Sequence, residues 1–133
     1  MTASERVDSI LEVWNKIDCV RFAVWCAKRV EHLSIGSTTG PAIAAVEKWI
    51  ENPSRQIKYR ADTASFAFAI NHNQKYAHNA AYYAAWSATG SPIRPAGCAT
   101  LACSASATAS GDTNAYDLLQ IYLSEQLLSA VNS

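Results

Sequence analysis

Three histidines and four cysteines are the residues of this 133-residue chain best suited to bind a metal ion. His72 and His78 are six residues apart, and His32 lies far from both. Two metal ligands on one helix need a spacing of about three or four residues, because only that spacing puts both side chains on one face. The histidines therefore predict no metal site. A site that the fold assembles from His72, His78 and a cysteine stays open, and it would make the chain a metal-binding module or an enzyme.

The cysteines do not follow a redox or zinc motif. Cys19 and Cys26 are seven residues apart, and Cys98 and Cys103 are five apart, so no CxxC pair is present. Free cysteine in a helical protein commonly behaves as a small hydrophobic residue. We expect all four to be reduced and buried.

The sequence also lacks the pairings that catalysis requires. The serines of residues 104–110 have no neighbouring His, Asp or Glu in the sequence that could act as a base. It contains no glycine-rich phosphate loop and no close pair of carboxylates. We therefore expect that the chain is not an enzyme and that it has no catalytic residue, metal or cofactor.

A tryptophan flanked by arginines is the pattern that best suits the binding of a protein partner. Polar and aromatic residues recur at helical spacing on the second predicted helix, namely Asp18, Arg21, Trp25, Arg29 and His32. Tryptophan and arginine are enriched among the residues that dominate the energetics of protein interfaces. The last four of these residues form the predicted partner-binding site. The alternative is that Trp25 packs at the edge of the core beneath the aliphatic stems of the arginines.

Charge is balanced over the whole chain but not along it. There are 11 basic and 11 acidic residues, which gives a formal net charge of zero. Nucleic-acid-binding proteins usually carry a basic field or stripe, so we expect no nucleic-acid partner. No Lys or Arg follows Arg94, whereas Asp112, Asp117 and Glu125 do. This acidic last third is a second candidate surface, suited to a basic partner through electrostatic steering.

Alanine-rich helices are the elements that must position these residues. Alanine, the best intrinsic helix former, occupies 24 of the 133 positions. β-branched and aromatic residues show no clustering with period two, so strands are not predicted. The sequence predicts a single all-α domain over residues 1–133, a compact alanine-rich bundle of six or seven helices. Rows of alanine let helices approach closely, and we expect the remaining space to be filled by Trp14, Trp25, Trp49 and Trp86.

Capping and breaking residues divide the first half of the chain. Thr2 and Glu5 predict a capping box for the first helix, and Asp18 is the predicted N-cap of the second. Pro41 suits the first turn of a third helix, which should end at Asn52-Pro53.

The second half is divided in the same way. Two helices are predicted over residues 55–71 and 74–88. Residues 89–97 contain two prolines and two glycines, which cannot continue a helix. A helix of small residues follows over 96–109 and breaks at Gly111. The last predicted helix is amphipathic, with its apolar face formed by Tyr116, Leu119, Tyr122, Leu123, Leu127 and Val131.

The chain shows no sign of a secretory or membrane destination. Its first ten residues lack the apolar stretch of a secretory signal. The longest apolar stretches, such as residues 80–86, are far too short to span a bilayer. We expect a soluble, cytoplasmic protein without a membrane partner.

The segment RFAVWCAKRVEHL, followed by a loop and PAIAAVEKWIENPS, resembles the Imm-5 family of immunity proteins, which accompany bacterial polymorphic toxins. The family pattern has an aromatic residue four positions before a Cys-Ala pair, then a basic-Val pair, a proline, an Ala-Ile helix and a closing tryptophan. The residues that match it are Phe22, Cys26, Ala27, Arg29, Val30, Pro41, Ala42, Ile43 and Trp49. An alanine-rich run that begins near Arg60 and the segment Cys98-Ala99-Thr100 extend the resemblance to roughly residues 17–110. The segments SIGSTTGP and SATASGDTN depart from the pattern.

This resemblance implies an immunity protein that binds a cognate toxin and neutralises it by stoichiometric occlusion, without turnover. The alternative is another protein-binding inhibitor, such as a phage or mobile-element protein directed against a host defence enzyme. A toxin gene next to this one would favour the first, and a prophage cluster would favour the second.

Overall fold

The computed structural model describes residues 1–33, 39–53, 72–89 and 93–132, so the helix predicted over residues 55–71 lies outside it. Within these residues it contains α-helices, one 3₁₀ helix and no strand, which confirms the all-α prediction. No helix in this part of the chain combines the length and apolar character needed to cross a membrane. The elements are α1 (Ala3–Leu11), α2 (Lys16–Arg29), η1 (Glu31–Leu33), α3 (Thr39–Glu51), α4 (His72–Thr89), α5 (Pro95–Ser110) and α6 (Ala115–Val131).

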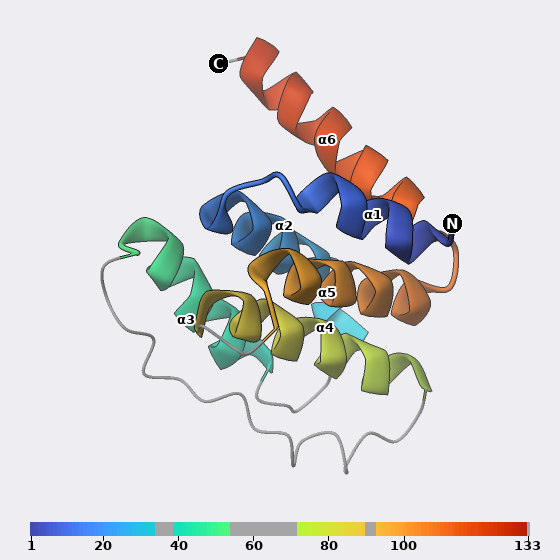
Figure 1. The fold of residues 1–133 in the computed structure, drawn as a ribbon. Coiled ribbons are helices and arrows are strands. Elements are labelled where there is room, and N and C mark those ends of the chain that lie inside the picture. The colour runs from blue at the N-terminus through green and yellow to red at the C-terminus, as the bar shows by residue number, and fades with distance from the viewer. Residues whose placement is uncertain (34–38, 54–71, 90–92, 133) are drawn as a thin grey trace.

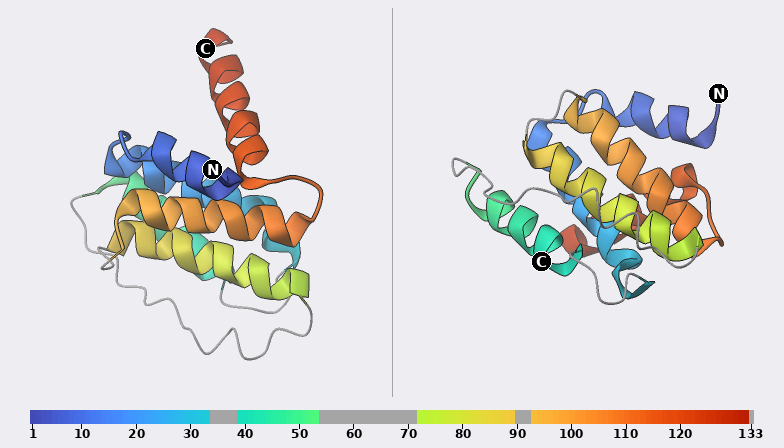
Figure 2. Two further views of the ribbon diagram at one scale, coloured as in Figure 1. Left: turned by 45° about the vertical axis from the view of Figure 1, so that its right-hand side comes forward. Right: turned by 90° about the horizontal axis from the view of Figure 1, so that it is seen from below.

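Helices α2, α4 and α5 form the centre of the bundle, and each of them packs against the other two. Helix α3 flanks α2 and α4, and α1 lies over α5 (Figure 1). Helix α6 starts beside α1 and α5, and its C-terminal end projects away from the other helices in Figure 1 and in the left view of Figure 2.

Small side chains fill the centre of the bundle. Ala80 and Ala84 of α4 and Ala99 and Ala102 of α5 have no exposed surface. The helix of small residues predicted over 96–109 is α5, and two rows of its side chains are buried, at 5% exposure or less: Cys98, Ala99, Ala102, Cys103, Ala105 and Ala107. Small residues at a helix contact allow the two backbones to approach closely. The extensive packing of α4 on α5 therefore follows from the alanine pattern.

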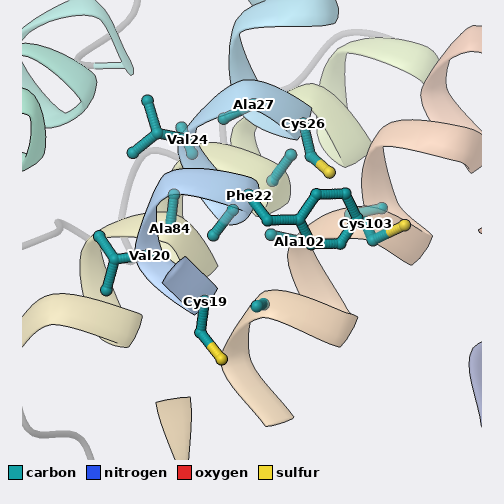
Figure 3. Packing of buried hydrophobic residues seen from close by; sticks show 14 of the residues in the cluster. Cys19, Val20, Phe22, Val24, Cys26, Ala27, Ala84, Ala102 and Cys103 are labelled. Carbon is teal, nitrogen blue, oxygen red and sulfur yellow. The ribbon is translucent and has the colours of Figure 1, made fainter. Parts of the chain in front are cut away.

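Among the described residues, Phe22 is the largest fully buried side chain. It extends from α2 towards Ala102 and Cys103 of α5 (Figure 3). Of the tryptophans, only Trp49 belongs to the buried core, whereas Trp14 and Trp25 are half-buried against its edge. The expectation that every tryptophan fills the interior is therefore wrong for these two and for Trp86, which is also only partly buried, because the alanine rows leave little space to fill.

The predicted capping box of the first helix is confirmed. The Thr2 side chain accepts a hydrogen bond from the Glu5 backbone N–H, and the Glu5 carboxylate accepts one from the Thr2 N–H. The second helix begins three residues earlier than predicted, because Asn15 is its N-cap and accepts from the Asp18 N–H at 2.9 Å. Asp18 lies instead in the first turn, where its negative charge still interacts favourably with the helix dipole.

Helices α5 and α6 are separated by a short break at the predicted position. Gly111 ends α5 with a left-handed backbone (φ 76°), and its N–H donates to the Ala107 carbonyl. Asn114 then caps α6 by accepting from the Asp117 N–H at 2.8 Å. The Arg6 guanidinium lies 3.7 Å from the centre of the Tyr116 ring, which holds the first turn of α6 against α1.

The prediction that the apolar residues of α6 form one face on the core is wrong in the second half of the helix. Leu119 and Tyr122 are buried, but Leu127 and Val131 are 66% and 72% exposed. A helix of this length spans about 25 Å, and α6 continues beyond the last helix that it packs against.

Candidate functional site

Trp25, at the centre of the predicted binding site, is held by residues from two helices. Its indole stacks on Phe22, with ring centres 6.2 Å apart, and meets the Tyr122 ring edge-on at 5.2 Å. Its Nε1 donates a hydrogen bond to Oε2 of Glu125 at 2.8 Å. Trp25 therefore packs at the edge of the core with its orientation fixed by α6, while part of the ring stays exposed.

Arg21 and Arg29, the two arginines of the predicted binding site, flank this tryptophan on α2. Both are exposed. Arg29 lies over the indole, with its Cζ 5.0 Å from the ring centre, within the range of a cation–π interaction. Arg21 lies one turn earlier on the same helix, beside Tyr122. The structure thus brings Arg21, Trp25 and Arg29 together on one exposed face.

A groove next to this face separates α2 from α6. It has a volume of about 240 Å³ and is lined by Trp14, Asp18, Arg21, Tyr122, Leu123 and Gln126. Burial raises the pKa of the Tyr122 phenol, the Asp18 carboxylate raises it further, and the Arg21 guanidinium opposes both effects. The phenol is therefore a neutral hydrogen-bonding group at neutral pH. The groove brings the Asp18 carboxylate and the Arg21 guanidinium together with the Trp14 and Tyr122 rings.

His32 does not lie on α2 with the other three residues. The helix ends at Arg29, Val30 caps it, and the exposed His32 belongs to the 3₁₀ helix η1. The prediction that the second helix carries His32 is therefore wrong, because the chain turns at Val30.

The cysteines are free and buried, as predicted. Burial is the main cause that raises the pKa of the Cys26 thiol well above its usual range. His78 is buried on α4 at 5% exposure, and the side chain of His72 lies outside the described part of the chain. Among the described residues, no group of three or more His, Cys, Asp or Glu side chains is placed to hold a metal ion.

Sequence reasoning missed Tyr122 and Glu125, which fix Trp25 from the far end of the chain. The two residues are three positions apart on α6, so they share the helix face that meets α2. That spacing is visible in the sequence, but nothing in it shows which helix this face meets.

The described residues thus form one exposed face with a fixed aromatic ring, two exposed cations and an adjoining groove. No protein-family model matches this chain, and neither a curated protein nor a solved structure matches it. The function is therefore argued from the residues and from this surface.

Proposed function

We propose that this chain is an immunity protein that binds a cognate toxin and neutralises it by stoichiometric occlusion. Two things support the proposal: the resemblance of residues 17–110 to the Imm-5 family, and the surface formed by Arg21, Trp25 and Arg29. That surface, which we call the α2 face, is the observation that carries it.

The α2 face has the properties of an interface centre. Trp25 is held by stacking and by the bond to Glu125, so binding would cost it little further side-chain entropy. Exposed arginines can form paired hydrogen bonds to the carboxylates of a partner. The neighbouring groove can accept an apolar side chain. We infer that the toxin presents an acidic and apolar patch to this face.

Co-expression with the toxin encoded by the neighbouring gene tests the proposal. We expect the chain to rescue growth and to co-purify with the toxin at a fixed ratio. Absence of both rescue and complex would contradict it.

Charge reversal tests the surface. Arg21→Glu together with Arg29→Glu should weaken the complex at least tenfold, without a change in the circular dichroism spectrum, because both side chains are exposed. Lys75→Glu is the matched control, since Lys75 is an exposed cation on α4. Unchanged affinity in the double variant would remove the α2 face from the interface.

A different inhibitor, directed against a host defence enzyme, would use the same kind of surface. It is distinguished by its target: the chain would then fail to bind the neighbouring toxin and would co-purify with the defence enzyme from its host.

A further inference from the structure

The outer half of α6 carries apolar side chains that no described residue covers. Leu127, Leu128 and Val131 are 66%, 62% and 72% exposed, and Ile121 and Leu123 are each 37% exposed. These five are most of the large apolar side chains exposed in the described part of the chain. Apolar surface concentrated in this way marks an interaction site. Leu123 also lines the groove against α2, so the other four, Ile121, Leu127, Leu128 and Val131, are called the outer α6 face.

The outer α6 face lies on the side of the helix turned away from the bundle. Helix α6 packs through Ala115, Leu118, Leu119 and Tyr122, and successive residues of a helix are rotated by about 100°. At that rotation the side of the packed residues continues through Glu125, which binds Trp25. Leu127 and Val131 fall on the opposite side. Helix α6 thus has two faces, and the bundle uses only one.

We propose that the outer α6 face binds the same face of a second copy of this chain, with the two α6 helices antiparallel about a two-fold axis. An isologous interface requires a surface that is complementary to itself. No charge on this face opposes pairing with a copy of itself, because residues 121–131 contain one charged residue, Glu125, and its carboxylate points to Trp25. The formal net charge of the chain is zero, so the two copies do not repel each other at long range.

The shape of the face also suits a copy of itself. Ser124 is a small exposed residue in the middle of the leucines. In an antiparallel pair centred between Ser124 and Leu127, Leu127 of each copy lies opposite Ser124 of the other, so a large side chain fills each gap. This is the knobs-into-holes packing of paired helices.

The position of α6 allows the pairing and limits its strength. Because the end of α6 projects from the bundle (Figure 2), two helices can lie side by side with their bundles at opposite ends. A pair of single helices buries less than the roughly 800 Å² per partner of a standard interface. The dimer therefore depends on concentration.

Sedimentation velocity of the purified full chain tests the proposal, at concentrations from about 1 μM to about 200 μM. We expect the wild type to pass from monomer to dimer over this range. Leu127→Glu should stay monomeric, because pairing would bury a charge. Gln126→Glu, the neighbouring exposed residue on the groove side, should dimerise like the wild type. A monomeric wild type, or a Leu127→Glu variant that still dimerises, would overturn the proposal.

Cross-linking provides a second, independent test. The four native cysteines are buried, so a single added cysteine is the reactive one. Ser124→Cys should form a covalent dimer in a glutathione redox buffer, and Gln126→Cys should not. Equal cross-linking of the two variants would contradict the antiparallel pair. A wild type that stays monomeric, together with loss of toxin rescue in Leu127→Glu, would assign the face to the toxin instead.

Discussion

The indole Nε1 of Trp25 donates a hydrogen bond to Oε2 of Glu125 at 2.8 Å and so connects two residues that are 100 positions apart. This bond lies where α6 leaves the bundle. Beyond it, α6 exposes Leu127, Leu128 and Val131. The bond to Glu125 therefore marks the end of the part of α6 that the bundle stabilises.

Removal of this acceptor should loosen α6. We expect Glu125→Ala to lower the free energy of unfolding by about 1 kcal/mol, since the bond is partly exposed. Amide hydrogen exchange in α6 should become faster than in α5. Glu125→Gln, which keeps an acceptor oxygen, should lose less. If amide hydrogen exchange in α6 is equally fast in Glu125→Ala and in the wild type, the hydrogen bond does not stabilise the helix.

The contact between α4 and α5 should not accept a larger side chain. Ala102 has no exposed surface, so Ala102→Leu should lower the free energy of unfolding by about 2 kcal/mol through overpacking. Ala44→Leu places the same side chain at an exposed position of α3 and should change stability by less than about 0.5 kcal/mol. Urea denaturation measures the free energy of unfolding of both variants. Similar unfolding midpoints for Ala102→Leu and Ala44→Leu would contradict close packing at Ala102.

Among the glycines that the structure describes, Gly111 should be the most sensitive to substitution by alanine on conformational grounds. Its φ of 76° lies in the left-handed region, and a Cβ there would meet no atom within 4 Å. Gly111→Ala should therefore cost about 1 kcal/mol through backbone strain alone. Asn tolerates this conformation better, so Gly111→Asn should be milder. Thermal unfolding compares the two, and an Ala variant as stable as the wild type would count against the strain.

Cys19 should make the fold sensitive to alkaline pH. Burial, with a further contribution from the Asp18 carboxylate, raises the pKa of its thiol to about 11. As the pH rises, the thiol of the unfolded chain loses its proton before the thiol of the folded chain does. The contribution of Cys19 to the free energy of unfolding is therefore complete below about pH 8.5 and disappears as the pH rises to about 11. The difference in unfolding free energy between the wild type and Cys19→Ala should therefore shrink by roughly 2 kcal/mol over that range. Parallel pH profiles would contradict the raised pKa.

Features that depend on neighbouring residues could be predicted from the sequence. The Thr2–Glu5 capping box, the break at Gly111 and the buried rows of α5 all follow from local spacing and side-chain size. Even so, the N-cap of the second helix was predicted wrongly as Asp18, because Asn15 is a residue type that can equally accept from a backbone N–H three positions ahead of it.

Features that depend on contacts between distant segments could not be predicted. The pattern of α6 shows many apolar positions but not where the bundle ends, so Leu119 and Leu127 look alike in the sequence although one is buried and the other exposed. The orientation of Trp25 depends on Tyr122 and Glu125 for the same reason.

The alanines between α4 and α5 have a consequence for motion. Alanine has no side-chain rotamer to lose on folding and none to change afterwards. Helices α4 and α5 pack against each other, and Ala80, Ala84, Ala99 and Ala102 are fully buried in them, so a displacement of one helix finds few side chains that could rearrange to absorb it. We therefore expect the two helices to move as one rigid body, so that a conformational change in the described part of the chain would involve α6 rather than this contact.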